Sequence, residues 1–286
     1  MSLHLLQLQF TLRSGGIRFP AFPGAAWHGG LGMMLERLHP QAFQALYSVT
    51  PESRLYAIKP AHAAAIPEGE SFYLRVSLFG SATQYALAIG EAIAALGQVG
   101  LRPGGSYQIA AAHYLATTDW QAFFSEEGGL HNQPQAYPLA DFLNVMPSGA
   151  HKLTLHFTTP LRIKEGNDLV RVAPRYEQLI KRTLGRLDQL AFSAGDSLLY
   201  SKESRASLLD EATAVCLASA HLESDSIERC SARSKQRMQF DGLLGEVEYA
   251  GEMSATLPII LAASLVQVGG KTAFGFGGIE IGNLLN

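Results

Sequence analysis

Residues 3–38 read LHLLQLQFTLRSGGIRFPAFPGAAWHGGLGMMLERL, and this stretch sets the fold class. Its first part alternates apolar and polar residues up to position 12, which is the period of a half-buried strand. A Ser-Gly-Gly break follows. Apolar residues then recur three and four positions apart between Trp27 and Leu38, which predicts an amphipathic helix ending before His39-Pro40. The chain therefore opens with a strand and a helix.

The rest of the chain continues as two similar series of elements. In the first half, the residue pattern predicts strands at 55–59, 71–79 and 107–116 and an Ala-rich helix at 82–99. In the second half, it predicts strands at 152–163 and 271–281, helices at 176–190 and 257–268, and two strands within 230–253 that turn at Asp241-Gly242. Each half then has the order strand, helix, two strands, helix, strand.

This order is that of the ferredoxin-like fold. We therefore predict an α+β protein with two tandem ferredoxin-like (βαββαβ, RRM-like) domains. The predicted boundaries are 1–118 for the first domain and 151–286 for the second, which carries a glycine-rich loop. Residues 119–150 are polar and contain several Gly and Pro, and we interpret them as the connection between the domains.

The composition excludes several classes of protein. With 286 residues, 47% of them hydrophobic, the chain has enough apolar material for folded cores and is not a disordered protein. Its formal net charge of -3 excludes a nucleic-acid binder that is basic throughout, so any such contact needs a local basic patch. The two cysteines form no CxxC and the histidines show no metal spacing, which predicts neither a metal site nor a cofactor. Neither a secretory signal nor a membrane span is predicted, which favours a cytoplasmic location.

The sharpest local feature is the glycine-rich stretch VGGKTAFGFGG at 268–278. It fails the Walker pattern, because Leu265 stands where the first Gly would be, and it fails the dinucleotide pattern, because Glu280 stands where the third would be. A plain turn and a loop whose amides cradle an RNA backbone remain as alternatives. The candidate residues for the second role are Gly269, Gly270, Lys271, Gly275 and Gly277.

Two groups of cations are candidates for contacting phosphates. The residues between 229 and 240 include no acid, and on a strand the cations at 233, 235 and 237 share one face. On the long helix at 176–190, three arginines near its apolar arc lie apart from the acids. An ordinary solvated face is the alternative in both cases. The first group is Arg229, Arg233, Lys235 and Arg237, and the second is Arg175, Arg182 and Arg186.

Two histidines flank the first predicted helix. His28 lies near its start and His39 at its end, where the helix dipole favours the charged form of imidazole. Histidine suits proton transfer near neutral pH, so both are candidates for acid–base chemistry. The plainer alternative for His39 is a cation that caps the helix before a proline.

Taken together, these segments resemble a known family, the CRISPR repeat-RNA-processing endoribonucleases of the repeat-associated RNA-binding (RAMP) superfamily. The resemblance rests on WHGGLG at 27–32, TTPLR at 158–162, the stretch from Arg233 to Gly245, and the glycine-rich stretch at 268–278. It covers most of the chain. The chain departs from the family pattern at His28, where arginine is common, and at Gly269-Gly270, where Gly-x-Gly is usual.

The resemblance implies cleavage within CRISPR repeats without a metal ion. The ribose 2′-hydroxyl attacks the adjacent phosphorus and leaves 2′,3′-cyclic phosphate and 5′-hydroxyl ends. His39 matches the location of a frequent catalyst in this family, and His28 is the second choice, with Tyr47 in support. Lys271 and the loop amides would hold the RNA backbone, and the two groups of cations would bind the stem. The implied partners are repeat RNA, as a stem-loop or single strand, then CRISPR effector subunits and a second copy of the chain, but no membrane.

Two rival functions stay open at this point. A superfamily relative that holds guide RNA in an effector complex without cutting would keep the loop and the basic faces but need no histidine. A ferredoxin-like protein that binds a small molecule would show no salt-sensitive RNA binding.

Overall fold

The computed structural model divides the chain into two compact units. Unit 1 comprises Met1–Phe142, Gln189–Ser197 and Ala273–Gly275, and unit 2 comprises the remaining residues. The side chains of 129–130, 225–230 and 237–240 are not described. The structure describes residues 3–19, 22–101, 104–125, 129–130, 132–145, 149–230 and 237–285.

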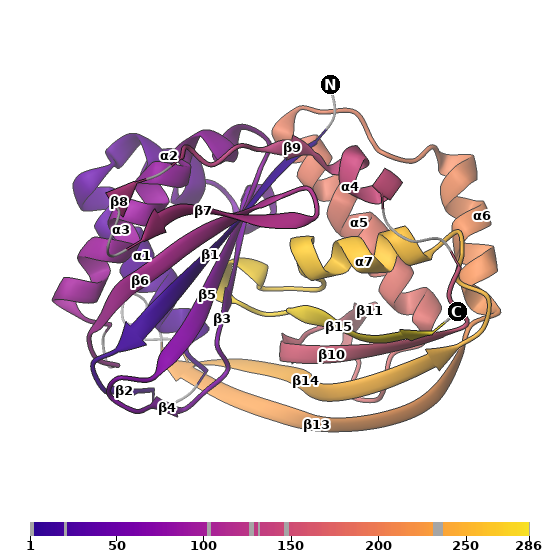
Figure 1. Ribbon diagram of the computed structural model, residues 1–286. Coiled ribbons are helices and arrows are strands. Elements are labelled where there is room, and N and C mark those ends of the chain that lie inside the picture. The colour runs from indigo at the N-terminus through magenta and orange to yellow at the C-terminus, as the bar shows by residue number, and fades with distance from the viewer. Residues whose placement is uncertain are drawn as a thin grey trace. The chain divides into compact units, whose positions relative to one another are not determined.

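Unit 1 has the predicted ferredoxin-like order. Its antiparallel sheet runs β3-β5-β1-β6, and β7 and β8 extend it beyond β6 (Figure 1). The strands are β1 (His4–Ser14), β2 (Ile17–Arg18), β3 (Tyr56–Pro60), β4 (Ala65–Ile66), β5 (Ser71–Phe79), β6 (Tyr107–Ala116), β7 (Asp119–Ser125), β8 (Gly129–Leu130) and β9 (Tyr137–Pro138). The helices are α1 (Gly24–Leu38), α2 (Pro40–Tyr47), α3 (Ala86–Val99) and α4 (Leu139–Val145), with short 3-10 helices η1 (Pro51–Ser53) and η2 (Gly80–Tyr85).

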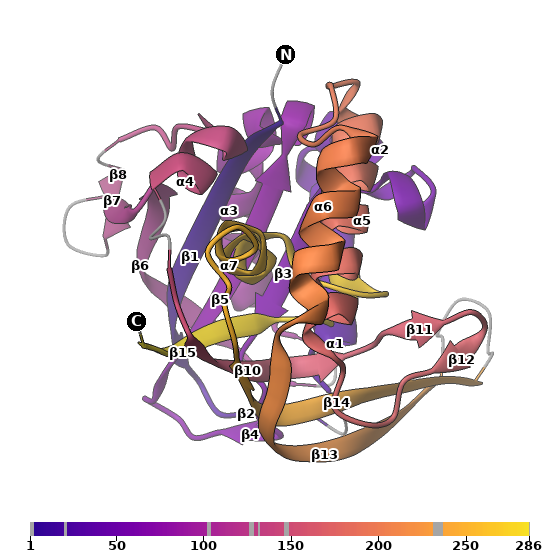
Figure 2. The same ribbon diagram turned by 90° about the vertical axis from the view of Figure 1, so that its right-hand side faces the viewer.

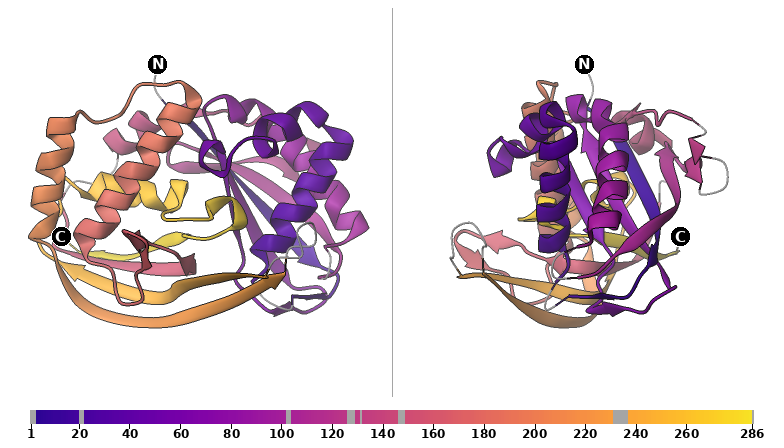
Figure 3. Two further views of the ribbon diagram at one scale, coloured as in Figure 1. Left: turned by 180° about the vertical axis from the view of Figure 1, so that it is seen from behind. Right: turned by 90° about the vertical axis from the view of Figure 1, so that its left-hand side faces the viewer.

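Helices α1 and α3 lie side by side on one face of this sheet (Figure 3). The predicted apolar stripe of α1 is the buried face, since Trp27, Leu31 and Leu35 are each at most 2% exposed. Burying such side chains stabilises a fold by about 1.5–3 kcal/mol each, which explains why the stripe selects this face. The packing also brings the C-terminal end of α1 next to α3.

The segment predicted to connect the domains is largely part of unit 1. Residues 119–125 form β7, which pairs with β6, and Phe123 is only 3% exposed. Unit 1 continues to Phe142. We interpreted this segment as a linker because it is rich in Gly, Pro and polar residues. A strand at a sheet edge can also be mostly polar, because only one of its faces is buried.

Unit 2 repeats the order, with its sheet running β13-β14-β10-β15. Figure 2 shows α6 in front of α5, and an ion pair between Arg205 and Asp188 links the two helices. The strands are β10 (Lys152–Leu161), β11 (Lys164–Glu165), β12 (Asp168–Leu169), β13 (Cys216–Cys230), β14 (Arg237–Ala250) and β15 (Ile279–Leu285). The helices are α5 (Tyr176–Ala194), α6 (Lys202–Thr213), α7 (Leu257–Val266) and the 3-10 helix η3 (Thr272–Phe274). Two tandem ferredoxin-like folds are therefore confirmed.

Three details of unit 2 differ from the prediction. The central hairpin consists of β13 and β14, so Asp241-Gly242 is not its turn but a part of β14 that pairs with Ser226 and Asp225. A glycine stands there because a Cβ would lie 2.6 Å from the Cβ of Pro160 on β10. Helix α6 was not predicted, and the last strand starts at Ile279 instead of residue 271. In the part of the chain that the structure describes, no helix is both long and apolar enough to cross a membrane.

Candidate functional site

His39 lies directly after α1, and its side chain is 27% exposed. Its backbone N–H donates to the carbonyl of Leu35, which closes the last helical turn. Its Nε2 lies 2.8 Å from a carboxylate oxygen of Glu91 on α3, a close contact that is poorly aligned as a hydrogen bond. The contact places a carboxylate beside the imidazole. His39 is thus a surface imidazole with a carboxylate next to one nitrogen.

His28 lies inside the same helix but has a different environment. It is 8% exposed, and its Nδ1 is 3.0 Å from the hydroxyl of Tyr56. Its ring stacks on Tyr47 with centroids 4.9 Å apart and packs against Phe274 at 4.0 Å. Phe274 belongs to the short segment Ala273–Gly275, which is part of unit 1 although it lies near the end of the chain. This enclosure suits a packing role better than contact with a substrate, so the two predicted histidines are not equivalent.

Tyr47 belongs to this aromatic cluster. Its hydroxyl donates to the carbonyl of His28 at 3.1 Å, and its ring stacks on Tyr56 at 5.2 Å. Burial, with a smaller effect from Tyr56, raises the pKa of Tyr47 well above its ordinary value, although Arg54 opposes the shift. Burial likewise raises the pKa of Tyr56. Both phenols therefore stay protonated near neutral pH, and Tyr47 can donate a hydrogen bond but cannot act as a base.

Two residues of this region escaped the sequence analysis. Glu91 stands on a helix far along the chain from His39, and only the packing of α1 against α3 brings them together. Arg54 lies just before β3, with its guanidinium carbon 5.9 Å from the centroid of Phe274. Nothing in the local pattern around either residue signals these contacts.

The glycine-rich loop is tied to the end of β10. The N–H groups of Gly270 and Gly277 donate to the carbonyls of Arg162 and Pro160, at 2.9 and 3.0 Å. The N–H of Gly278 donates to the hydroxyl of Thr159 at 2.7 Å. We predicted that the amides of Gly270 and Gly277 hold RNA. In the structure these amides instead donate to backbone carbonyls of unit 2, which corrects the prediction.

The glycines of this loop are needed for close backbone packing. At Gly269 a Cβ would lie 2.3 Å from the Arg162 carbonyl oxygen, and at Gly277 it would lie 1.9 Å from that of Val268. Both have positive φ, 91° and 76°, which L side chains rarely adopt. Gly275 has φ 86° and belongs to unit 1, where a Cβ would lie 2.7 Å from the ring of Pro60.

Lys271 also has positive φ, 70°, and its side chain is exposed. A left-handed residue that is not glycine is uncommon, and such strain is typical of functional sites. The N–H of the preceding Gly270 donates to Arg162, and the carbonyl of Lys271 accepts from the N–H of Phe276. These hydrogen bonds fix the backbone on both sides of an exposed cation. Of the predicted residues in this loop, Lys271 is the one that offers a charged side chain.

The arginines of α5 divide between surface and core. Arg186 is 7% exposed, its Nε is 3.5 Å from the carbonyl of Val266, and burial lowers its pKa to about 10. Thr183, one turn earlier, is fully buried. The buried face of α5 is therefore wider than its apolar arc. The prediction of Arg186 as part of an exposed stripe is wrong.

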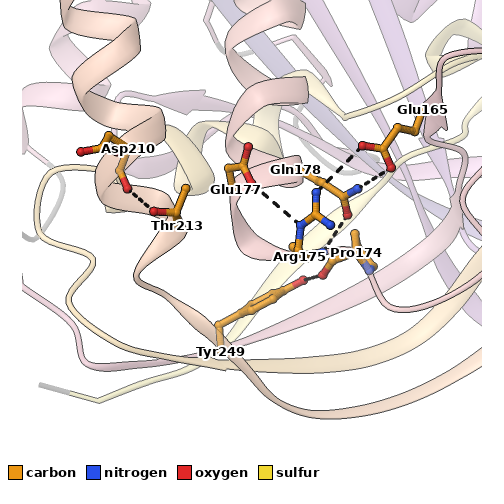
Figure 4. Close-up of polar contacts among 8 residues, drawn as sticks. All are labelled: Glu165, Pro174, Arg175, Glu177, Gln178, Asp210, Thr213 and Tyr249. Carbon is orange, nitrogen blue, oxygen red and sulfur yellow. Dashed lines mark hydrogen bonds and ion pairs between the residues drawn. The ribbon is translucent and has the colours of Figure 1, made fainter.

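Arg175 and Arg182 lie at the surface, as predicted, but with polar partners. Figure 4 shows Arg175 between Glu165 and Glu177, each with a nitrogen-to-oxygen distance of 3.9 Å. The guanidinium of Arg182 donates to the carbonyl of Lys164. The predicted separation of Arg175 from acidic residues is therefore wrong, because Glu177 is close enough to pair with it.

The side chains of the four predicted cations in the hairpin lie outside the described part of the chain. Arg233 and Lys235 lie outside the described residues. Arg229 and Arg237 pair with neighbouring residues of β13 and β14 in the ladder, but their side chains are not described.

The sequence matches the family described as "CRISPR-associated endoribonuclease Cas6" over residues 155–279. This range includes the TTPLR end of β10, α5, the hairpin, α7 and the glycine-rich loop. No curated protein sequence matches the chain. The predicted resemblance to the CRISPR repeat-processing endoribonucleases is confirmed over this range by the match.

Three solved structures illustrate that likeness. Thermus thermophilus Cas6 has a TM-score of 0.64 and 19% identity, with 98% of this chain and 99% of that chain covered. A Cas6 substrate mimic complex has a TM-score of 0.59 and 18% identity, with 99% and 100% covered. A partial Cas6-RT-Cas1–Cas2 complex has a TM-score of 0.65 and 15% identity, with 98% of this chain but 46% of that chain covered. At these identities the likeness establishes the fold.

Proposed function

We propose that this chain is a Cas6-type endoribonuclease that cuts CRISPR precursor RNA within its repeats, without a metal ion, and that His39 is its catalytic residue. The match to the Cas6 family over residues 155–279 supports RNA cleavage as the activity. The observation that carries the assignment to His39 is its partly exposed imidazole, held beside Glu91 at the end of α1.

The proposed reaction is an intramolecular displacement at phosphorus. The ribose 2′-oxygen gives its proton to a water molecule and bonds to the adjacent phosphorus, while the bond from phosphorus to the 5′-oxygen of the next nucleotide breaks. That oxygen takes up a proton and leaves as a 5′-hydroxyl, and the other product ends in a 2′,3′-cyclic phosphate. Glu91 contacts Nε2, so Nδ1 of His39 is the nitrogen that would exchange a proton with the RNA. A protonated His39 would supply the proton to the leaving oxygen.

Cations of unit 2 would hold the RNA. Lys271 is exposed on the glycine-rich loop and would contact a phosphate as a point charge. Arg175 and Arg182 would have to exchange their present partners for phosphates, whereas Arg186 is left out because it is buried. Arg229, Arg233, Lys235 and Arg237 remain proposed contacts to the stem. A basic surface of this kind recognises the shape of an RNA duplex more than its sequence.

The decisive experiment is single-turnover cleavage of a labelled repeat RNA in EDTA. The wild-type protein is compared with the variant His39→Ala, and a second RNA carries one 2′-deoxy sugar at the cut. We expect the wild type to cut the first RNA and to leave the deoxy RNA uncut, and we expect the variant to cut the first RNA about 10²–10⁴-fold more slowly. Mass spectrometry of the 5′ fragment should find a cyclic phosphate end.

Binding without cutting would overturn the proposal. If the wild type binds the repeat with a steep salt dependence but never cuts it, the chain is a guide-RNA-binding subunit. If cutting occurs but needs a divalent metal ion, the assignment of the 2′-hydroxyl mechanism and of His39 fails.

A further inference from the structure

A groove opens between α3 and the β6–β7 pair in unit 1. Its volume is about 470 Å³, within the ~300–1,000 Å³ typical of ligand sites. Among the described residues, Glu91 is the sole charged residue that lines it. The other lining side chains are mostly apolar, and four of them are aromatic: Phe10, Tyr107, Phe123 and Phe124.

The strand register explains why this groove is hollow. Phe10 of β1, Ala112 of β6 and Phe124 of β7 are direct partners across three neighbouring strands, so they share one face of the sheet. A small alanine thus lies between two phenylalanines. The register of β7 also shifts by one residue at this point, with Phe123 as the extra residue. Such a bulge lets both Phe123 and Phe124 line the same groove.

Helix α3 leaves the groove open instead of filling it. The residues that α3 places over the groove include Gly90 and Ala94, and Ala94 is exposed. A Cβ at Gly90 would approach one atom alone, on Phe10, at 3.9 Å. The ring of Phe124 is half-buried, so one part packs on the sheet while the rest faces the groove.

A second, polar pocket continues from the first. Its volume is about 420 Å³, and it shares Gln98, Tyr107 and Gln108 with the groove. Arg13 lines it together with hydroxyl groups and exposed backbone at glycines. Its one acid among the described residues is Glu68. An apolar aromatic hollow is thus followed, without a break in its lining, by a pocket with a cation and hydrogen-bonding groups.

We infer that this groove binds one base of the single-stranded RNA next to the cut, and that the polar pocket takes the sugar-phosphate that follows. The inference rests on the proposed function and names a substrate subsite for it. Glu91 connects the two, since it lines the groove and also contacts Nε2 of His39 at 2.8 Å. A base in the groove is therefore one side chain away from the proposed catalyst.

The chemistry of the lining favours a nucleobase over an apolar side chain of a protein. Any base can stack on an aromatic ring, and such stacking is worth about 1–3 kcal/mol per base. The amides of Gln98 and Gln108 supply both donors and acceptors for the edge of a base. Arg13 in the adjoining pocket suits a phosphate, which a partner helix or strand would not bring.

The test uses the full chain and a repeat RNA that carries a 2′-deoxy sugar at the cut, so that it binds without being cleaved. 2-Aminopurine replaces one base at a time near the cut, because its fluorescence falls when it stacks. In one variant, Ala94→Leu, a larger side chain fills the groove from an exposed helical position. In another, Phe124→Leu, the apolar volume stays but the aromatic face is lost. Ala206→Leu, at an exposed alanine of α6, is the matched control.

We expect one position next to the cut to be quenched in the wild type and in the control. Ala94→Leu should restore its fluorescence and weaken RNA binding about tenfold, with an unchanged melting temperature, and Phe124→Leu should do the same to a smaller extent. If both variants bind and quench like the control, RNA does not occupy the groove and the inference is wrong. Metal-free cleavage by the wild type would then still uphold the proposed function. If the quenching depends on Ala94 but no RNA is cut, the subsite stands and the nuclease proposal falls.

Discussion

The end of α1 and the glycine-rich loop both looked functional in the sequence, yet they are built in opposite ways. At the end of α1, His39 keeps part of its imidazole exposed and has one close charged neighbour, Glu91. In the loop, the amides of Gly270 and Gly277 bond to β10, and the glycines admit carbonyl groups that any Cβ would exclude. One region exposes a titratable side chain, and the other provides a hydrogen-bonded backbone. A motif can therefore be diagnostic of a family while most of its residues serve packing.

The replacement His39→Ala should have the largest effect and should separate chemistry from stability. Loss of a positioned acid or base lowers the rate by about 10²–10⁴-fold, so single-turnover cleavage of repeat RNA should fall by that factor. The melting temperature should not change, because the side chain is partly exposed and pairs with an exposed carboxylate. The exposed His221 offers a matched control, and His221→Ala should cut at the wild-type rate. Equal rates for the two variants would show that the end of α1 is not the catalytic region.

The replacement Gly277→Ala should do the reverse and act on stability. The new Cβ would lie 1.9 Å from a carbonyl oxygen at a φ of 76°, so we expect the free energy of unfolding to fall by about 2–4 kcal/mol. Urea unfolding followed by circular dichroism measures it. Gly270→Ala is the control, because no atom lies within 4 Å of its ideal Cβ, and its stability should change by less than about 1 kcal/mol. Similar losses in both variants would contradict the packing role that we assign to Gly277.

At the other end of α1, His28→Phe should sharpen the contrast between the two histidines. The ring stacking with Tyr47 is kept, but the contact between Nδ1 and the Tyr56 hydroxyl is lost. We expect the free energy of unfolding to fall by about 1–2 kcal/mol. The cleavage rate of the folded protein, measured well below its melting temperature, should stay within about threefold of the wild type. A rate loss as large as that of His39→Ala would instead place His28 in the reaction.

The smallest effect is expected for Lys271→Ala, which tests the single charged side chain of the loop. Removing one phosphate contact should weaken RNA binding several-fold and reduce the salt dependence, the slope of log K against log[salt], by about 1. Stability should change by less than about 1 kcal/mol, because alanine adopts φ 70° no more readily than lysine does and the replaced side chain is exposed. Filter binding at several salt concentrations measures the slope. An unchanged slope would mean that the loop serves packing alone and does not contact RNA.

Strand and helix order followed from the sequence because it depends on local periodicity. The structure buries the stripe of α1 from Trp27 to Leu35, although Leu38 is 44% exposed. It also buries the apolar residues of β1, together with Gln7. Strand β13 was missed because its residues 216–224 are mostly exposed and show no apolar alternation. Helix α6 was missed because it is also mostly exposed. Ala212 is its one buried residue, so the sequence shows no apolar stripe.

The site was less predictable because it depends on contacts between distant segments. His39 and the glycine-rich loop could be singled out from local pattern, but Glu91 becomes relevant only when α1 packs on α3. The burial of Arg186 depends on the carbonyl of Val266, eighty positions along the chain. The N–H of Gly278 in the loop donates to Thr159 of β10, which lies more than a hundred residues earlier. No window of sequence contains both partners of any of these contacts.

The aromatic cluster around His28 also affects how the protein is made. Phe274 completes that cluster, and it belongs to Ala273–Gly275, which the chain contributes to unit 1 after nearly all of unit 2. During translation, the ribosome releases Phe142 long before Phe274, so the aromatic cluster of unit 1 lacks this ring until nearly the whole chain has been made. A gene fragment that stops at residue 142 would lack this ring. The cluster in unit 1 is therefore completed only after most of unit 2 has been made, even though each unit has its own sheet.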